Sequence, residues 1–257
     1  MKIARSVALV TGASSGIGAA IAVDLARRGA TVVGAARREK ELEATAEECR
    51  HHAPGSFGIS ADLSVAEDCE RIVAATTERL GRLDILVNNA GITLHRHALE
   101  TSADDVELVL RVNFMAPVRT TMAALPGMVE RGQGSVVNVT SVAGAIPNPR
   151  ESAYGAAKAA LHLWSHGLAV DLTGTGVHVG DLSPGPIDTP IWDFDYRGRK
   201  YPPSVVAEAA AQMIERELVQ VTVPRQYGAI GALYGLPVLN RAIRKGLVDF
   251  ARKEERR

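Results

Sequence analysis

The chain has little of what would point to a disulfide-stapled or nucleic-acid-binding protein. It holds two cysteines in 257 residues, and Cys49 and Cys69 both fall in stretches with a helical pattern. Two thiols in a chain of this length do not make a disulfide framework. The 29 basic and 29 acidic side chains cancel, so the positive balance of a general nucleic-acid binder is missing. We expect reduced thiols, a cytoplasmic location and no nucleic-acid partner.

Long apolar runs are also scarce. No stretch reaches the roughly 18 to 20 apolar residues that a membrane-spanning helix needs, and Pro237 interrupts the nearest approach, residues 227–239. The apolar run at residues 7–10 is too short for the core of a signal peptide, and Thr-Gly follows it instead of a cleavage site. The sequence therefore predicts neither a membrane span nor export.

What the chain does contain is an alternation of short β-rich runs with longer helical patterns, typical of βαβ units around a parallel sheet. The runs predicted as strands are residues 6–10, 31–35, 56–59, 85–87, 135–139, 177–182 and 219–223. Helical patterns cover residues 17–28, 39–52, 65–80, 103–131 and 152–172. Most strand runs are nearly continuous in apolar residues, as expected where helices cover both faces of a sheet.

These patterns predict one α/β domain over residues 1–257. Its centre would be a doubly wound, Rossmann-type sheet of seven parallel strands, followed by a C-terminal helical extension from about residue 224. Ligands of such sheets bind beyond the carboxyl ends of the strands. The residues that directly follow each strand are therefore the candidates for function.

A glycine-rich turn at residues 11–18 follows the first predicted strand and opens the first helix. Glycines there allow a tight turn and let the backbone approach a pyrophosphate, which then lies against free N–H groups at the helix N-terminus. A glycine cluster alone is weak evidence, since a structural turn also explains it, but its place between strand and helix favours a nucleotide. The predicted contacts here are Gly12, Ser14, Ser15, Gly16, Ile17 and Gly18.

The end of the second predicted strand indicates which dinucleotide binds. An acidic residue would normally accept the ribose 2′-hydroxyl of NAD at this place, but the chain has Ala36 followed by Arg37 and Arg38. A guanidinium can grip a 2′-phosphate through two hydrogen bonds, whereas an acid would repel it. The alternative is an ordinary charged start to the next helix. We predict NADP(H), with NAD less favoured.

Ser141, Tyr154 and Lys158 form a pattern suited to carbonyl chemistry. Tyr154 and Lys158 at i and i+4 on a helix share one face, so the ammonium is expected to lower the tyrosine pKa from its ordinary value of about 10. The Ser141 hydroxyl could then hold a carbonyl oxygen while Tyr154 protonates it. The trio predicts interconversion of a ketone and an alcohol, with the hydride supplied by the dinucleotide.

With these motifs, the chain resembles the short-chain dehydrogenase/reductase family in its short soluble form, over about residues 7–189. Residues 11–18 look like the cofactor turn of that family, Asp62 and Leu63 look like its adenine-contacting pair, and residues 88–91 match its Asn-Asn-Ala-Gly. The resemblance implies cofactor contacts at Asp62, Leu63, Asn89, Ala90, Gly91, Tyr154, Lys158, Pro184, Gly185, Ile187 and Thr189.

The resemblance also implies roles for the catalytic residues. Ser141 would donate a hydrogen bond to the substrate oxygen, and Tyr154 would act as the general acid in reduction or the base in oxidation. Lys158 would lower the tyrosine pKa and hold the nicotinamide ribose. Asn113 would interrupt its helix and hold a water that passes protons to solvent. Taken singly, Ser141 could be an ordinary loop serine, Tyr154 and Lys158 a solvated pair, and Asn113 a surface amide of its helix. Asp62 could be the N-cap of the next helix.

The substrate side is less defined. Trp192, Phe194, Tyr196 and Tyr201 concentrate aromatics in a chain with 4% of them, so residues 186–217 are predicted as a lid over an apolar substrate, with a packed surface loop as the alternative. His95 and His97 flank the expected pocket as solvated histidines. Gly180, inside the sixth strand, predicts a bulge or a close approach.

The last segment and the partners stay open. Residues 227–250 hold a basic amphipathic pattern, with Leu239, Ile243, Leu247 and Phe250 on one face. Packing on this subunit or on a second copy is favoured over contact with a membrane surface. We expect a homodimer or larger homo-oligomer. The family's usual tetramer is in doubt, because residues 219–223 run into Pro224, Arg225 and a long tail where relatives often have Asp-Gly-Gly. Rival functions are a 3-oxoacyl-carrier reductase and a dinucleotide sensor without turnover.

Overall fold

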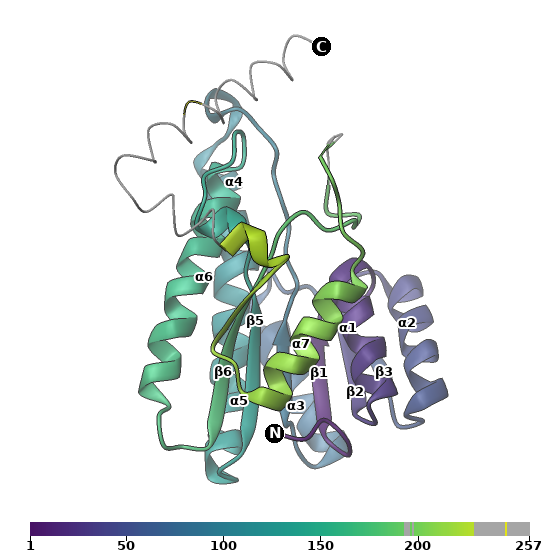
Figure 1. Ribbon diagram of the computed structural model, residues 1–257. Coiled ribbons are helices and arrows are strands. Elements are labelled where there is room, and N and C mark those ends of the chain that lie inside the picture. Colours follow the sequence, from purple (N-terminus) through teal and green to yellow (C-terminus); the bar gives the residue numbers. More distant parts are fainter. Residues whose placement is uncertain (193–195, 197, 229–244, 246–257) are drawn as a thin grey trace.

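Seven parallel strands lie at the centre of the protein in the order β3-β2-β1-β4-β5-β6-β7 (Figure 1). The computed structural model describes residues 1–192, 196, 198–228 and 245. The strands are β1 (Val7–Thr11), β2 (Thr31–Ala36), β3 (Phe57–Ser60), β4 (Ile85–Asn88), β5 (Gly134–Val139), β6 (Val177–Pro184) and β7 (Gln220–Val223). The seven predicted strands and the doubly wound sheet are therefore confirmed.

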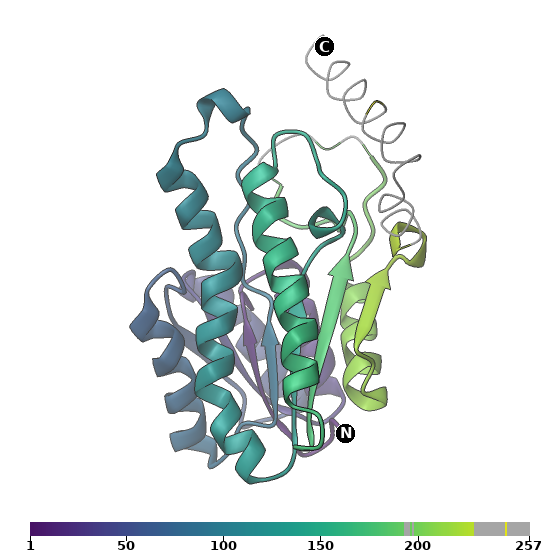
Figure 2. The same cartoon turned by 90° about the vertical axis from the view of Figure 1, so that its left-hand side faces the viewer.

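Helices cover both faces of this sheet, as Figures 1 and 2 show from two sides. The α-helices are α1 (Gly16–Arg27), α2 (Glu39–His52), α3 (Ala66–Leu80), α4 (Ala103–Leu110), α5 (Ala116–Glu130), α6 (Ser152–Asp171) and α7 (Ser204–Arg216). The helices α1, α2 and α7 pack on one face through residues such as Ile21 and Ile214. On the other face, α3, α5 and α6 pack through residues such as Ile72 and Met128.

The strand β1 shows why the strand runs are apolar throughout. All five of its residues are buried. Ala8 and Val10 point into one core and Val7 and Leu9 into the other, because successive side chains of a strand alternate between faces. The chain returns from β3 to β4 on the far side of β1. That reversal places a crevice at the carboxyl ends of β1 and β4.

The long helix predicted over residues 103–131 is divided. A π-helical turn, η2 (Arg111–Met115), lies between α4 and α5, and the fully buried Asn113 is at its centre. π-turns inside α-helices are often found at functional sites. The expectation that Asn113 interrupts its helix is confirmed.

The lid predicted over residues 186–217 is wrong in its second half. Residues 204–216 form α7, in which Val206, Ala210 and Ile214 are fully buried. These positions repeat every four residues and make one apolar stripe, which packs α7 against α1 and the sheet. The described residues of this range that precede α7, 186–192, 196 and 198–203, lie outside the helices and strands.

Gly180 causes no bulge. The pairing of β5 with β6 runs without a break from Gly134 and Val177 to Val139 and Leu182. A Cβ at Gly180 would collide with the sulfur of Met213 on α7. The close approach is thus confirmed, and the bulge is wrong.

Several other expectations can be placed. Both Cys49 and Cys69 are buried free thiols on α2 and α3. Within the described ranges, no helix combines the length and the apolar character that crossing a membrane requires. Phe194 and the apolar stripe at Leu239, Ile243, Leu247 and Phe250 lie outside the described residues.

Candidate active site

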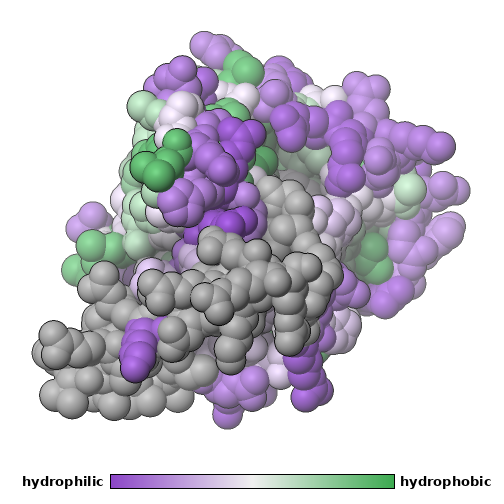
Figure 3. Space-filling view, turned by 90° about the horizontal axis from the view of Figure 1, so that it is seen from above, coloured by the Kyte–Doolittle hydropathy of each residue, from purple (hydrophilic) through white to green (hydrophobic). Residues whose placement is uncertain are grey.

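A cavity of about 600 Å³ opens at the carboxyl ends of the strands. Residues from the loops after β1, β2, β3, β4, β5 and β6 line it, as expected for the ligand crevice of a doubly wound sheet. Seen from above in Figure 3, the described surface is mostly hydrophilic, and its apolar residues form small separate groups. The predicted site residues in the lining are Gly12, Ser14, Ser15, Gly16, Ile17, Arg37, Arg38, Asp62, Leu63, Asn89, Ala90, Gly91, Ser141, Tyr154, Lys158, Pro184, Gly185, Ile187 and Thr189.

Gly18 lies beneath the glycine-rich turn, outside the cavity lining. A Cβ at this position would collide with the carbonyl oxygen of Gly12 and the side-chain amide of Asn89. Gly18 therefore lets α1 pack closely under the turn, which is the structural use of a glycine. The spacing of the glycines in the sequence does not distinguish this packing role from a direct contact with the dinucleotide.

The turn itself is held by Thr11 and Asn89. Gly12 and Gly16 adopt left-handed φ angles of 68° and 58°, which favour glycine. The Thr11 hydroxyl accepts hydrogen bonds of 3.0 Å from the backbone N–H groups of Asn89 and Ala90. Asn89 Nδ2 donates to the carbonyl of Thr11 at 2.9 Å. These bonds fix the turn that leads into α1, whose first residues Gly16 and Ile17 line the cavity, and free backbone N–H groups at a helix N-terminus suit an anion.

The two arginines after β2 differ in their contacts. Arg38 Nη2 donates to Ser14 Oγ at 3.1 Å and to Ser15 Oγ at 2.5 Å, so it is tied to the glycine-rich turn. Arg37 is exposed and also lines the cavity. A guanidinium pair at the edge of a cavity can hold a phosphate.

Asp62 does not cap the next helix. The helix α3 begins at Ala66, with Val65 in the N-cap position, so the N-cap interpretation is wrong. Asp62 Oδ1 instead accepts a hydrogen bond of 2.9 Å from the N–H of Ser64. This local turn fixes Asp62 and Leu63 at the cavity wall.

Ser141, Tyr154 and Lys158 meet on one wall of the cavity. Ser141 follows β5 as the cap of a short helical turn, and its Oγ accepts from the N–H of Ala143 at 3.1 Å. Tyr154, in the first turn of α6, is hydrogen-bonded to Ser141. Lys158, one turn later, is buried, and its Nζ donates to the carbonyl of Val139 at 2.9 Å.

Burial dominates the titration of this pair. It raises the pKa of Tyr154 to about 12, against the lowering effect of the hydrogen bond with Ser141, and the charge of Glu151 raises it further. The net direction is therefore upward, and the expected lowering of this pKa by Lys158, whose Nζ lies 5.8 Å from the centre of the phenol ring, stays a prediction. Burial also lowers the pKa of Lys158 to about 8, partly opposed by the charge of Asp181.

Asn113 lies behind this wall and outside the lining. Its Nδ2 donates to the carbonyls of Ile92 at 2.9 Å and Val109 at 3.0 Å, and its Oδ1 accepts from the N–H of Ile92 at 3.2 Å. A Cβ on Gly91 would lie 2.6 Å from this Oδ1 and 3.6 Å from Lys158 Nζ. Asn113 therefore fixes the segment after β4 against Lys158.

The outer part of the cavity is partly aromatic. The rings of Trp192 and Tyr196 stack with centres 4.7 Å apart, and Trp192 Nε1 donates to the carbonyl of Ile187 at 2.6 Å. Both residues and His95 line the cavity, whereas Tyr201 and His97 do not. Of the described aromatic residues of the predicted lid, Trp192 and Tyr196 therefore line the cavity.

Sequence reasoning missed Glu151. This carboxylate is 6% exposed and lines the cavity three residues before Tyr154. It accepts hydrogen bonds from Asn148 Nδ2 at 2.8 Å and from Thr93 Oγ1 at 3.4 Å. Its position directly before the helix that carries Tyr154 could have indicated that Glu151 lies near the site.

Comparison with known proteins decides the family. The family model described as short chain dehydrogenase matches residues 6–199. The chain belongs to the short-chain dehydrogenase family. An uncharacterised oxidoreductase of Staphylococcus saprophyticus is 37% identical over 213 residues, which cover 82% of this chain and 91% of that protein.

Solved structures of this family share the fold. A variant of the actinorhodin polyketide ketoreductase with NADPH is 32% identical, with a TM-score of 0.79, and the match covers 85% of this chain and 95% of that one. The 3-ketoacyl-(acyl-carrier-protein) reductase of Brucella melitensis with NADH is 28% identical, with a TM-score of 0.81 and coverages of 86% and 97%. The chain is thus an oxidoreductase of a family whose members bind nicotinamide dinucleotides.

The residues present fit such a dinucleotide. Gly16 and Ile17 at the start of α1 line the cavity together with Arg37, Arg38 and Lys158, whose Nζ donates to the carbonyl of Val139 at 2.9 Å. Pyrophosphate oxygens and ribose hydroxyls would each find donors of suitable chemistry here.

Proposed function

We propose that the protein is an NADP(H)-dependent reductase that converts a ketone on a largely apolar small molecule into a secondary alcohol. The observation that carries this proposal is the meeting of Ser141, Tyr154 and Lys158 with the glycine-rich turn in one cavity. A tyrosine in this position has no structural need for a buried lysine on the next helical turn. Reduction is the expected direction, because cellular NADPH is mostly in its reduced form.

Ser141 and Tyr154 would act together on the carbonyl oxygen. Their hydroxyls are hydrogen-bonded to each other, so an oxygen placed between them can accept from both. With its pKa raised to about 12, Tyr154 stays neutral near pH 7 and can serve as a proton donor. The nicotinamide, when bound, supplies the hydride.

Lys158 and Asn113 would position the reacting groups. The Lys158 ammonium, held by the carbonyl of Val139, faces the place where the nicotinamide ribose would lie and favours the tyrosinate that forms after proton transfer. Asn113 holds Ile92 and, through it, the wall beside Lys158. A proton returning to Tyr154 from solvent would pass along this wall.

Replacement of Tyr154 tests the reaction. Tyr154→Phe keeps the ring and removes the proton donor, so we expect the rate of ketone reduction to fall by about 10²–10⁴-fold. NADPH binding, followed by the fluorescence of NADPH, should persist. Tyr201→Phe, outside the cavity, is the control and should retain activity. Unchanged turnover in Tyr154→Phe would refute the proposal, and tight cofactor binding without turnover of any ketone would favour a dinucleotide sensor.

The preference for NADP(H) rests on Arg37 and Arg38. We expect the ratio of the Kd for NADH to that for NADPH to fall by about tenfold or more in Arg37→Ala, since a phosphate contact of a guanidinium is worth about 1.5–3 kcal/mol. Lys40→Ala, an exposed cation of α2 outside the cavity, should leave the ratio unchanged. A wild-type ratio near one would overturn the NADP(H) preference, and an equal ratio in wild type and Arg37→Ala would overturn the role of Arg37 in it.

A second candidate is reduction of a 3-oxoacyl group held on a carrier, as the name of the Brucella melitensis protein states for that protein. The stacked Trp192 and Tyr196 at the mouth of the cavity favour a free apolar substrate, which aromatic rings can cover. Kinetics with one 3-oxoacyl group, offered free and carrier-bound, would separate the two. A kcat/KM at least tenfold higher for the carrier-bound form would favour the second candidate.

A further inference from the structure

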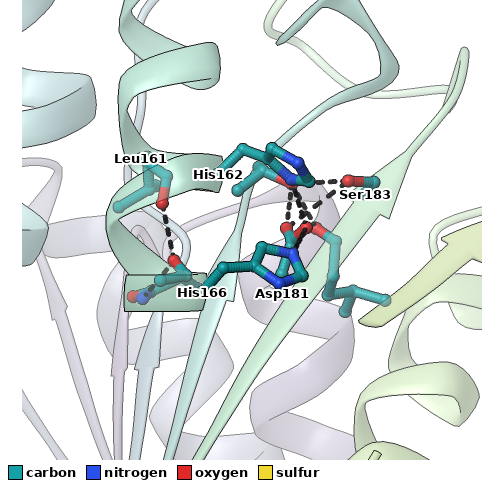
Figure 4. Close-up of polar contacts among 9 residues, drawn as sticks. Leu161, His162, His166, Asp181 and Ser183 are labelled. Atoms are coloured by element: carbon teal, nitrogen blue, oxygen red, sulfur yellow. Dashed lines mark hydrogen bonds and ion pairs between the residues drawn. The ribbon is translucent and has the colours of Figure 1, made fainter. Parts of the chain in front are cut away.

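Two histidines and an aspartate converge on the side of β6 that α6 covers (Figure 4). His162 and His166 come from one face of α6, since i and i+4 lie one above the other on a helix. Asp181 comes from the middle of β6 and is 1% exposed. One ligand atom from each of the three residues lies within 4.8 Å of the other two.

Asp181 is oriented by its neighbours. Its Oδ1 accepts from the hydroxyl of Thr140 and, at 3.4 Å, from that of Ser183. Its Oδ2 points to the two imidazoles, 2.6 Å from His162 Nδ1 and 3.5 Å from His166 Nε2. Hydrogen bonds of this kind, which fix one oxygen and leave the other for an ion, are typical of carboxylates that bind metals.

His166 is incompletely satisfied. Its Nε2 is buried and has no hydrogen-bond partner among the residues that the structure describes. Buried polar nitrogens normally have one. The separation of 3.5 Å from Asp181 Oδ2 matches two ligands of one tetrahedral Zn²⁺ ion, which lie about 3.3–3.5 Å apart for bonds of about 2.0–2.2 Å.

His162 requires a small movement. Its Nδ1 now shares a hydrogen bond with Asp181 Oδ2 at 2.6 Å. When an ion replaces the proton between them, the two atoms separate by about 0.7 Å to reach the same tetrahedral spacing. The side chain of His162 is 36% exposed, so it has room for this shift.

A cavity of about 440 Å³ adjoins the cluster. His162 lines it with polar groups of Ser183, Gln220 and Thr222. Of the three ligands, His162 lines this cavity, which gives an ion an approach to that side chain and leaves space for water to complete the coordination.

We propose that His162, His166 and Asp181 bind one divalent transition-metal ion, Zn²⁺ above all. Two imidazoles and one carboxylate suit zinc and its neighbours in the first row, whereas Mg²⁺ and Ca²⁺ take oxygen ligands. The ion clamps α6, which carries Tyr154 and Lys158, to β6, which ends at Pro184 on the cavity wall. Its role is structural, and it takes no part in hydride or proton transfer.

Titration of the full chain with Zn²⁺ tests this proposal. After removal of metals with a chelator, calorimetry should show one equivalent bound per chain, and the melting temperature should rise by several degrees with excess Zn²⁺. His166→Ala and His162→Ala should each weaken binding at least tenfold and lose the thermal shift. His51→Ala is the matched control, since it removes an exposed histidine from α2, and it should bind as wild type does.

Co²⁺ provides a second readout that does not depend on variant stability. Bound at two nitrogens and an oxygen in tetrahedral geometry, Co²⁺ should give intense visible absorption in the wild-type chain, and Zn²⁺ should displace it. Zinc affinity that His166→Ala leaves unchanged, or no binding by wild type, would overturn the proposal and leave a hydrogen-bonded His162–Asp181 pair. Neither measurement involves NADPH or turnover, so its outcome is independent of the proposed reaction.

Discussion

Lys158 carries a charge in a place where burial disfavours it. The residue is 4% exposed, with one backbone carbonyl as its hydrogen-bond acceptor, and its pKa falls from 10.5 to about 8. The unfolded chain solvates this ammonium better than the folded protein does. Below about pH 8 the buried, charged Lys158 therefore lowers the free energy of unfolding. Functional sites often carry such a cost in stability.

Replacement of Lys158 by methionine should consequently stabilise the fold. We expect Lys158→Met to raise the free energy of unfolding by about 1–3 kcal/mol at pH 7, less what the lost hydrogen bond to Val139 contributes. Because the folded pKa lies below the unfolded one, wild type gains stability as pH rises from about 8 to 10.5, and the difference should shrink over that window. Urea unfolding at pH 7 and pH 10 measures it.

The control is Lys40→Met, which removes an exposed lysine from α2. Its unfolding free energy should change by less than about 0.5 kcal/mol at either pH. A Lys158→Met variant that is destabilised equally at both pH values would contradict the proposed electrostatics.

At the scale of single residues, the sequence indicates which residues form the site better than it indicates how deeply each one is buried. The spacing of Ser141, Tyr154 and Lys158 indicated the site because i and i+4 on a helix share a face. The direction of the Tyr154 pKa shift was not accessible, since it depends on burial that only the fold creates. The approach of His162 and His166 to Asp181 was equally hidden, because it joins a helix to a neighbouring strand.

At the scale of elements, the start of α1 depends on one glycine. Gly18→Ala would push a methyl group into the carbonyl of Gly12 and the amide of Asn89, neither of which can move without opening the glycine-rich turn. We expect a loss of about 1–3 kcal/mol in stability and weaker NADPH binding. Denaturant unfolding and a fluorescence titration measure the two effects.

Gly167→Ala is the matched control on another helix. Gly167 lies within α6, and a Cβ there meets no atom within 4 Å. This substitution should be neutral or stabilise the protein by up to about 1 kcal/mol. If both variants behaved alike, close packing beneath the turn would not be the reason for Gly18.

Prediction of elements succeeded where one periodicity dominated. The seven strands were visible as apolar runs, and the helical pattern over residues 65–80 ends where α3 does, at the left-handed Gly81 with its φ of 78°. The helix α7 was missed because the lid inferred from Trp192, Tyr196 and Tyr201 was extended beyond these aromatic residues, to residue 217. The apolar stripe of Val206, Ala210 and Ile214, with its helical spacing, indicates that the lid ends before residue 204.

At the scale of the whole molecule, α5 and α6 lie side by side on one outer face (Figure 2). Leu163 and Val170 of α6 are 74% and 73% exposed, and Met122 of α5 is 50% exposed. Exposed apolar side chains gathered on paired helices are typical of subunit contacts. We therefore propose that the expected homo-oligomer is a homodimer formed through α5 and α6.

Leu163→Glu tests the homodimer. A charge at the centre of an apolar contact should weaken self-association at least tenfold, and sedimentation equilibrium should report the mass of one chain at concentrations where wild type is dimeric. Leu99→Glu is the control, since Leu99 is 91% exposed on the separate turn Ala98–Glu100. A wild-type chain that sediments as a monomer would refute the dimer.

Transfer of a labelled hydride tests the central claim most directly. NADPH deuterated at one or the other face of nicotinamide C4 is incubated with a panel of apolar ketones, and the products are analysed by mass spectrometry. The account predicts an alcohol that carries one deuterium on its carbinol carbon from one labelled form of NADPH and none from the other, because the cavity walls fix the nicotinamide face. Tight NADPH binding without deuterium in any product would contradict it.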